Sequence, residues 1–363
     1  MYKTTLLIPT RNRPERIERL VSFLAKESED YDITIKVLDG STSDDIARRN
    51  EQACLANKIG YKHYDPDLHF FKRVYEALQD VDTLTVSMLD DEDIISLKGL
   101  MDCVTFLNEH EDYSITAGQY KVFHYAESGI SFSNCYQGQS FEQESQLERI
   151  RAVLNPYITP ICYAVHKTSS LKLTFMELSN AAPKILDDDY ATIELLWAAI
   201  VASCGKLKRL ESFYIGRGSY EKPEIRREES SYKTQIMNNL DYAMGLMNYE
   251  TSFVESHRRN RGILLKYLPE IDKEHASKII DLIFAYYFFH QDIPRTLTHK
   301  YNQAFEPRVS FKKRICNRLR YEKSRIADFL FLQRRNIRRN GLELVDVLFI
   351  LQKPRLNLSS KQK

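Results

Sequence analysis

The N-terminal quarter of the sequence alternates between short apolar runs of strand length and longer runs with the 3.6-residue period of an amphipathic helix. The strand-like runs are residues 4–9, 33–41, 60–65 and 82–89, and the helical runs are residues 13–27, 44–60 and 69–81. Strands that alternate with helices are typical of a mostly parallel sheet with helices on its faces. The sequence therefore predicts an α/β domain with a Rossmann-like sheet.

Further strand and helix signals follow, and long helical periodicities replace them beyond about residue 230. We expect helices over 97–110 and 187–205, a strand over 113–125, a loop with the start of a helix over 126–150, a strand and turn over 161–171, and a strand over 207–224 that runs into a flexible polar loop. A polar segment, residues 221–231, predicts a boundary. We expect an α/β domain over 1–225 and a mainly α-helical region over 226–363.

The composition is that of a soluble globular protein, with 43% hydrophobic residues, 28% charged residues and a net charge of +2. The six cysteines are scattered without a CxxC pair, which argues against a zinc site or a disulfide framework. The sequence shows no signal-peptide pattern and no apolar run long enough to span a bilayer. These features predict a reducing, cytoplasmic location.

A basic stretch interrupts this near-neutral balance, because residues 311–340 contain eleven Lys or Arg against Glu322 and Asp328. Apolar residues recur between the basic ones, as in an amphipathic helix pair that docks on anionic lipid at the inner face of the cell membrane. The alternative is a helical bundle with a solvated basic surface. The aromatic interleaving of a single-strand nucleic-acid platform is absent, so we expect no nucleic-acid partner.

Polar side chains gather where the first strands end. Thr10 to Arg13 follow the first strand, Asp39 to Ser41 follow the second, and Asp90 to Asp93 follow the strand over 82–89. Ligands of open α/β sheets bind outside the carboxyl ends of the strands. These three segments are therefore the expected binding site.

The same segments, IPTRNRPERIERL, VLDGS and LTVSMLDDEDI, resemble the inverting GT-A glycosyltransferases of family 2 in their order and spacing. They are most similar to a bacterial subgroup found with surface-polysaccharide genes, and the resemblance covers roughly residues 3–220. It implies a GT-A fold and a metal-dependent transfer of sugar from a nucleotide-sugar donor. The acceptor implied is a saccharide or a lipid-linked sugar of a bacterial surface polysaccharide.

The resemblance also implies roles in nucleotide binding. The turn after the first strand would line the base and ribose, Asp39 would bind the base, and Arg217 would lie in a mobile loop that closes over the diphosphate. A guanidinium suits that role because it donates in a bidentate fork to phosphate oxygens. The full set of nucleotide-binding residues implied is Pro9, Thr10, Arg11, Arg13, Asp39, Lys72, Asp91 and Arg217.

The acidic run matches the DxD signature of the family, which implies a bound Mn²⁺ or Mg²⁺. Such an ion neutralises the charge that grows on a nucleoside diphosphate leaving group, and one or two carboxylates suffice to hold it. The DxD spacing favours Asp91 and Asp93 as ligands, whereas alignment on the following segment favours Glu92. The alternative for the whole run is a solvated turn that caps the next helix.

The catalytic base implied by the resemblance lies in or after the second acidic cluster. An inverting transfer needs one carboxylate to accept the proton of the acceptor hydroxyl. The start of the helix favours Asp188 or Asp189, and counting back from Gly205 favours Glu194. The choice between Asp189 and Glu194 stays open, and capping of the helix by these acidic residues is the structural alternative.

Two other functions compete with a glycosyltransferase. A nucleotidyltransferase would carry a glycine-rich loop near the N-terminus, and IPTRNRPER has no glycine. A non-catalytic module that binds a polysaccharide or a protein partner stays open, because the acidic motifs are irregular. The histidines show no metal-ligand spacing, so we expect them to be structural, and we expect Trp197 to lie in the core.

Overall fold

The computed structural model describes residues 2–126, 129–135, 138–154, 161–181, 190–219, 251–268 and 272–289. The chain divides into two compact units. One comprises Met1–Val153 and Tyr157–Gln235, and the other comprises Leu154–Pro156 and Ile236–Lys363. The boundary expected near residue 225 lies outside the described residues.

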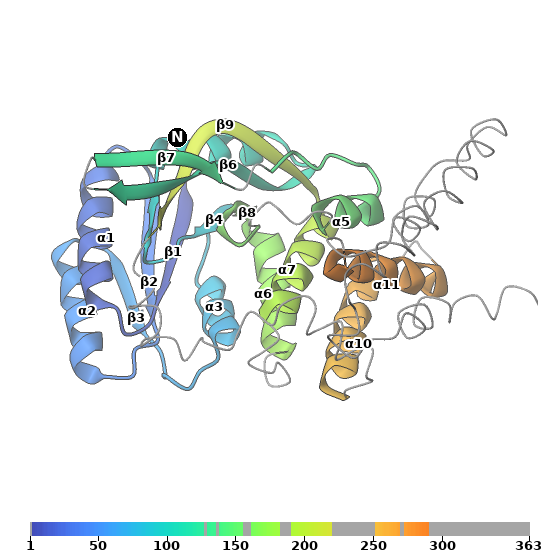
Figure 1. Cartoon of the computed structure of the whole chain (residues 1–363). Coiled ribbons are helices and arrows are strands. Elements are labelled where there is room, and N and C mark those ends of the chain that lie inside the picture. The colour runs from blue at the N-terminus through green and yellow to red at the C-terminus, as the bar shows by residue number, and fades with distance from the viewer. Residues whose placement is uncertain are drawn as a thin grey trace, which may run out of the picture. The chain divides into compact units, whose positions relative to one another are not determined.

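The first unit is built on one sheet, which is drawn with its helices in Figure 1. Its strands are β1 (Thr4–Thr10), β2 (Ile33–Asp39), β3 (Gly60–His63), β4 (Thr85–Met88), β5 (Asp93–Ile95), β6 (Tyr113–Ala126), β7 (Gly129–Cys135), β8 (Val165–Lys167) and β9 (Lys206–Ser219). The helices up to residue 219 are α1 (Pro14–Glu27), α2 (Asp44–Ala56), α3 (Phe70–Gln79), α4 (Leu97–Glu109), α5 (Gln146–Leu154), the 3₁₀ turn η1 (Ile161–Tyr163), α6 (Thr168–Ala181) and α7 (Tyr190–Cys204).

The strand order is β3-β2-β1-β4-β8-β6-β9-β5, and β7 pairs with β6 beside this path. The pairs β1–β2, β2–β3, β1–β4 and β6–β9 are parallel, and the remaining pairs are antiparallel. The first four strands thus have the order of a doubly wound sheet. The expected α/β fold class, with a sheet flanked by helices, is confirmed. The sheet is mixed where we expected a mostly parallel one, because β5, β7 and β8 pair antiparallel with their described neighbours.

Apolar residues explain why these segments form the core. β1 is buried along almost its whole length, with Leu6, Leu7 and Ile8 fully buried, as a central strand between two helical layers requires. α1 buries one helical face against the sheet and begins with Pro14, whose fixed φ suits the first turn. Each fully buried Leu or Ile contributes about 1.5–3 kcal/mol through the hydrophobic effect.

The crossovers place helices on both faces of the parallel strands. α1 and α2 pack against each other on one side, and α3 lies on the other side, where it packs against α6 (Figure 1). Parallel strands bring their carboxyl ends to one edge, and the register pairs Thr10 with Asp39 and Asp39 with His63. The ends of β1 and β2 therefore lie side by side, as the sequence predicted, and the end of β3 lies beside that of β2.

For the middle of the chain, one expectation was wrong and another was confirmed only in part, because β8 is the strand expected within residues 161–171. Residues 126–150 contain a strand, β7, that pairs with β6 in a hairpin, where we expected a loop before the helix. Residues 161–171 contain only three strand residues, and Thr168 begins α6. The reason is tertiary: Leu171, Phe175 and Leu178 form a buried face that the sequence pattern did not separate from a strand.

The second unit contains two described helices, α10 (Thr251–Lys266) and α11 (Lys273–Phe289), as the helical periodicity predicted. Asp281 of α11 pairs with His257 and Arg261 of α10 at 2.9 Å each. The basic stretch 311–340 lies outside the described residues. Among the helices that the structure describes, none is long and apolar enough to span a membrane.

Candidate functional site

The turns that follow β1 and β2 are cross-linked by their own side chains. Asn12 adopts a left-handed conformation with φ of 57°, which asparagine tolerates better than most residues. Its backbone N–H donates to Ser41 Oγ at 2.9 Å, and its side-chain oxygen accepts from the Thr42 N–H at 2.9 Å. His63, at the end of β3, bonds the Ser41 carbonyl through Nε2 at 2.9 Å. The three strand ends thus form one rigid edge.

Asp39, implied by the resemblance to bind the base, is fully buried at this edge. Its carboxylate accepts hydrogen bonds from the Ser41 N–H at 2.7 Å, Asn50 Nδ2 at 2.8 Å and Tyr61 Oη at 2.9 Å. Burial and the Asp39 charge raise the pKa of Tyr61, so its hydroxyl stays a donor. The carboxylate therefore holds the β2–α2 turn in place, and three of its roughly four acceptor positions are in use.

Arg73 of α3 places its side chain at the ends of β1 and β2. Its guanidinium is buried and donates to the Thr10 carbonyl at 3.4 Å. It lies directly over Gly40, where a Cβ would stand 1.5 Å from Arg73 Nη1. Lys72, the residue implied by the resemblance, is exposed. The helical period carried a signal for Arg73, since it lies four residues before the buried Ala77.

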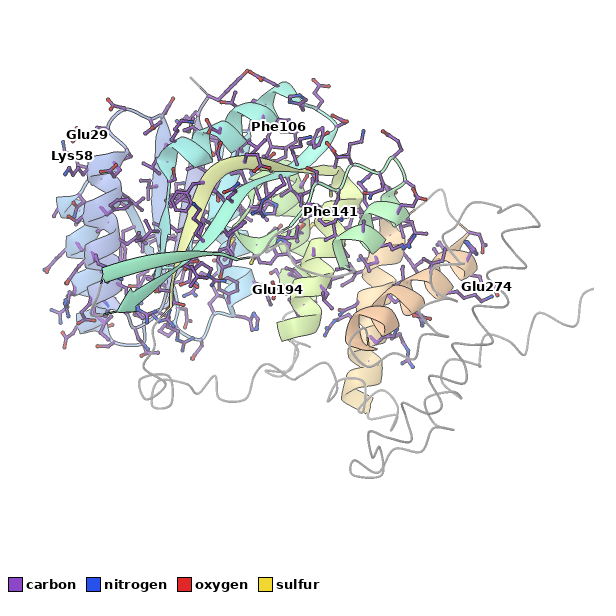
Figure 2. All side chains as sticks on the ribbon, turned by 45° about the horizontal axis from the view of Figure 1, so that its top comes forward. Glu29, Lys58, Phe106, Phe141, Glu194 and Glu274 are labelled. Carbon is purple, nitrogen blue, oxygen red and sulfur yellow. The ribbon has the colours of Figure 1, made fainter. Side chains whose placement is uncertain are left out.

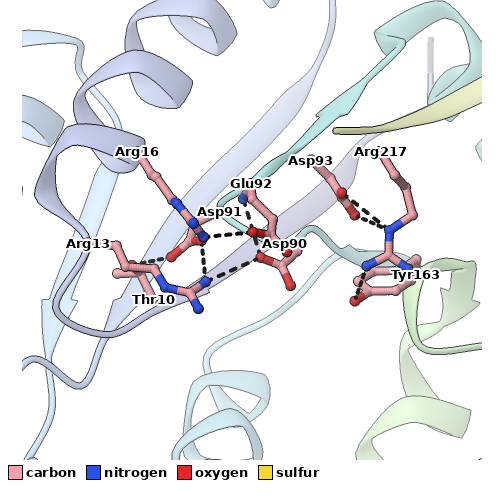
Figure 3. A network of polar contacts seen from close by, with 9 residues as sticks. All are labelled: Thr10, Arg13, Arg16, Asp90, Asp91, Glu92, Asp93, Tyr163 and Arg217. Carbon is pink, nitrogen blue, oxygen red and sulfur yellow. Dashed lines mark hydrogen bonds and ion pairs between the residues drawn. The ribbon is translucent and has the colours of Figure 1, made fainter. Parts of the chain in front are cut away.

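The acidic run begins at the end of β4, and its second member is tied to the turn after β1 (Figure 3). Asp91 is 2% exposed and accepts from Thr10 Oγ1 at 2.6 Å and from Arg13 Nη1 at 2.9 Å. Thr10, Arg13 and Asp91 were all implied to contact the nucleotide, and the structure brings them together. Of their neighbours, Pro9 is half-buried and Arg11 is exposed.

The other members of the run also face arginines (Figure 3). Glu92 pairs with Arg16 at 2.8 Å, whereas the Asp90 carboxylate lies 3.9 Å from Arg13. Burial, together with the charges of Asp91 and Glu92, raises the pKa of Asp90 to about 6. Of the carboxylates of Asp90, Asp91 and Glu92, that of Asp90 thus lies farthest from its arginine partner.

Asp93 starts β5 and faces Arg217 directly across the antiparallel β5–β9 pair. Arg217 Nε lies 3.3 Å from Oδ2 and 3.4 Å from Oδ1 of Asp93, and Nη2 donates to Tyr163 Oη at 3.3 Å. Burial raises the pKa of Asp93 to about 7, an effect that Arg217 opposes and Asp90 and Glu92 increase. The expectation that Arg217 lies in a loop was wrong, because β5 extends the sheet and draws residue 217 into β9.

The side chains at this edge carry more negative than positive charges, which favours binding of a cation. Four carboxylates meet three arginines at this edge, so the carboxylate charges outnumber the arginine charges by one. No group of three or more His, Cys, Asp or Glu side chains that could enclose a metal occurs among the described residues. The buried Asp93 Oδ2 accepts no hydrogen bond. The donor set therefore fits a hard cation that shares its ligands with phosphate and water.

The candidates for the catalytic base are only partly described. Asp188 and Asp189 lie outside the described residues. Glu194 is partly exposed on α7 and is labelled in Figure 2. Burial raises the pKa of the Cys162 thiol, and the charge of Glu194 raises it further while Arg217 opposes the rise. Cys162 lies in η1 beside Tyr163, so the charge of Glu194 reaches the segment that carries Tyr163.

Two histidines and Trp197 make structural contacts. His166 is fully buried and bonds the Ile161 carbonyl at 2.9 Å, and its neighbour Trp197 is 5% exposed. Trp197 packs edge-on against Phe175 with ring centroids 4.7 Å apart. His69 caps α3 by accepting from the Phe71 N–H. The expectation that Trp197 belongs to the core is confirmed.

Comparisons with known proteins give similar folds at low identity. No protein-family model and no curated protein matches the chain. S. aureus TarS 1–349 in complex with UDP-GlcNAc is 15% identical, with a TM-score of 0.48 over 83% of this chain and 79% of that one. The same TarS fragment with UDP is 16% identical, with a TM-score of 0.48 over 94% and 93% of the two chains.

A more distant similarity is to glucosyl-3-phosphoglycerate synthase from Mycobacterium tuberculosis in complex with Mn²⁺, UDP and glucosyl-3-phosphoglycerate. It is 11% identical, with a TM-score of 0.37 over 64% of this chain and 77% of that one. Identities and TM-scores at this level carry no inference about function. The function of this chain has to be argued from its own residues.

Proposed function

We propose that this chain is a glycosyltransferase that moves a sugar from a nucleotide-sugar donor to a saccharide or lipid-linked acceptor. The observation that supports it best is the meeting of the Asp90–Asp93 run with Arg13, Arg16 and Arg217 at the carboxyl edge of the sheet. A nucleoside diphosphate and a divalent cation need this combination of cationic donors and hard oxygen ligands.

In this proposal, the turns after β1 and β2 receive the nucleoside, and Arg73 takes the place we expected for Lys72. Pro9, Thr10, Arg11 and Arg13 form the wall of that pocket. The rigid cross-links between Asn12, Ser41 and Thr42 preorganise the pocket, which lowers the entropic cost of binding.

Asp93 and its neighbour Asp90 are the carboxylates best suited to hold Mn²⁺ or Mg²⁺, because Asp91 and Glu92 form shorter bonds to arginines. The bound ion would supply Lewis-acid stabilisation of the diphosphate leaving group. Arg217 donates to the phosphate oxygens from the opposite strand. A carboxylate on or before α7, namely Glu194, Asp188 or Asp189, accepts the proton of the attacking hydroxyl, as the inverting outcome requires.

One observation favours a second candidate, a non-catalytic module that binds nucleotide or saccharide. The three carboxylates expected to bind metal, Asp91, Glu92 and Asp93, all have an arginine partner. Such a module would bind without metal and would not cleave a donor. Release of nucleoside diphosphate from a nucleotide sugar distinguishes the two candidates.

A thermal-shift screen tests the binding part of the proposal. The purified protein is heated with UDP, GDP, TDP, CDP or CMP, each with Mn²⁺ or with EDTA. A ligand that binds only the folded state raises the melting temperature. We expect one nucleotide to raise it when Mn²⁺ is present, and we expect Asp93→Ala to abolish that rise.

The control is Asp45→Ala, which removes an exposed carboxylate on α2 that pairs with Arg48, on the same helix. It should leave the shift unchanged. Absence of a shift with every nucleotide would remove the support for a nucleotide-sugar enzyme. A shift that persists in EDTA would favour the metal-independent binding module.

A further inference from the structure

The Asp93–Arg217 pair is longer than the two shortest ion pairs of the site, Arg13–Asp91 and Arg16–Glu92. Nε of Arg217 lies 3.3 and 3.4 Å from the two oxygens of the carboxylate. Arginine–carboxylate bonds of full strength are bidentate and about 2.7–2.9 Å long. The pair is therefore looser than Arg13–Asp91 at 2.9 Å or Arg16–Glu92 at 2.8 Å.

A second anchor holds the guanidinium at this position. Its Cζ lies 4.9 Å from the centre of the Tyr163 ring, a cation–π contact, and Nη2 donates to the Tyr163 hydroxyl. Tyr163 is itself fixed, because its carbonyl accepts from Tyr214 Oη at 2.8 Å. Arg217 would consequently stay at the site if its bond to Asp93 were broken.

The carboxylate is unusually poor in partners for a buried group. Asp93 is 2% exposed, and its Oδ2 accepts no hydrogen bond. A buried carboxylate in this state is destabilised unless a cation completes its surroundings. The arginine supplies a positive charge but no short hydrogen bond.

We propose that Arg217 and a divalent cation compete for the carboxylate of Asp93, so that metal binding releases the guanidinium to the donor's diphosphate. The idea rests on the proposed function, in that it assumes a metal at Asp93. Asp93 would hold the cation through the carboxylate that now pairs with Arg217. The contacts with Tyr163 would keep the guanidinium at this edge of the sheet, where it could donate to phosphate oxygens.

Competition has a consequence that can be measured without a nucleotide. If Arg217 must leave Asp93 before the cation binds, then removing the guanidinium strengthens metal binding, although most active-site substitutions weaken it. Binding events that are coupled within one protein commonly change each other's affinity by about 5–150-fold. We expect Arg217→Gln to bind Mn²⁺ at least about fivefold more tightly than the native protein.

The experiment titrates Mn²⁺ into the whole chain and follows free Mn²⁺ by electron paramagnetic resonance. The matched control is Arg209→Gln, which makes the same change of charge on the same strand, at a residue whose guanidinium lies over Tyr120. Asp93→Asn tests the ligand itself. We expect tighter binding in Arg217→Gln, little change in Arg209→Gln and loss of binding in Asp93→Asn.

A measurement on the native protein supports the titration if a variant folds poorly. The Nε–H resonance of Arg217, assigned by its loss in Arg217→Lys, should move when Mg²⁺ is added and should not move when NaCl of equal ionic strength is added. Equal or weaker Mn²⁺ binding in Arg217→Gln, or a fixed resonance, overturns the competition and leaves the metal site standing. Absence of Mn²⁺ binding in every protein overturns both the competition and the metal dependence of the proposed function.

Discussion

Asp91 and Asp93 belong to one acidic run, but they are held in different ways. Asp91 accepts short hydrogen bonds from Thr10 and Arg13. Asp93 has one long ion pair and a pKa raised to about 7, chiefly by burial. Hydrogen bonds to a charged group stabilise a fold, whereas a buried carboxylate with few donors destabilises it.

Substitutions at the two residues should therefore differ in their effect on stability. In EDTA at pH 8, we expect Asp91→Asn to lower the free energy of unfolding by about 1–3 kcal/mol, because it weakens charge-assisted bonds. Asp93→Asn should leave it unchanged or raise it, because it removes a desolvated charge. Urea unfolding of both variants and of the exposed control Asp45→Asn measures the difference, and equal losses in Asp91→Asn and Asp93→Asn would contradict this reading.

The sequence predicted which residues stand at the strand ends, because strand ends follow from the alternation of apolar and polar residues. It did not predict the partners of each carboxylate. Arg13 and Arg16 meet Asp91 and Glu92 only because β1 and β4 are neighbours in the sheet. The sequence also did not predict that Arg73, and not Lys72, reaches the site, because tertiary packing decides which face of α3 is buried.

The backbones of α4 and β9 approach each other closely at Gly99. A Cβ at Gly99 of α4 would lie 2.0 Å from the Phe213 carbonyl oxygen of β9. Backbone cannot move aside as a flexible side chain can, so one of the two elements would have to shift. Since β9 carries Arg217, this contact positions the site as well as the fold.

We expect Gly99→Ala to lower the free energy of unfolding by about 3 kcal/mol through overpacking. The matched control is Gly262→Ala in α10, where a Cβ would meet nothing within 4 Å. That substitution should raise stability by about 0.5–1 kcal/mol, because alanine favours the helix. Thermal and urea unfolding test the pair, and a mild effect of Gly99→Ala would show that α4 does not pack against β9 as described.

His166 of β8 makes the stability of the protein depend on pH. Burial lowers the pKa of His166 to about 4, below its ordinary value of 6.5. The unfolded chain therefore binds more protons between pH 6.5 and 4, and stability falls as the pH decreases through that window. The loss attributable to this residue is at most about 3 kcal/mol.

The test compares urea unfolding of the native protein and of His166→Gln at pH 7 and pH 4.5. The native protein should lose more stability between the two values than the variant, which cannot titrate at this position. His275→Gln, on the exposed face of α11, should behave like the native protein. An identical pH dependence in the native protein and His166→Gln would show that His166 is solvated.

The elements themselves were predictable to different degrees. α1 and α3 each show a clear apolar face, and β1 and β2 are continuous apolar runs, so the sequence located them. β7 alternates Gly, Ser and Asn with Ile and Phe over seven residues, and its only described sheet partner is β6. Its strand structure depends on pairing with β6, which local sequence does not encode.

For the whole molecule, the charge distribution suggests a location for the chemistry. The basic stretch 311–340 is the strongest departure from a neutral balance, and the resemblance implies a lipid-linked acceptor. Each Lys or Arg near an anionic bilayer contributes about 1 kcal/mol to binding. A peripheral position on the inner face of the membrane follows as a prediction.

Flotation with liposomes tests this prediction. The full chain should float with vesicles of phosphatidylcholine and phosphatidylserine and should stay at the bottom with phosphatidylcholine alone. Added salt should weaken the binding, because the attraction is screened. Replacing Arg334, Arg335, Arg338 and Arg339 by Gln should reduce flotation, whereas equal flotation with both lipids would contradict an electrostatic contact.

The most direct test of the whole account is donor cleavage. The purified chain is incubated with Mn²⁺ and one nucleotide sugar at a time, and released nucleoside diphosphate is quantified by mass spectrometry. We predict release from one class of donor by the native protein and by Asp45→Asn, and a rate at least about 10²-fold lower in Asp93→Ala, which lacks a carboxylate that stabilises the leaving group. No release from any donor by a folded protein that binds nucleotide, or equal release by Asp93→Ala, would contradict the proposal that this edge of the sheet is a glycosyltransferase active site.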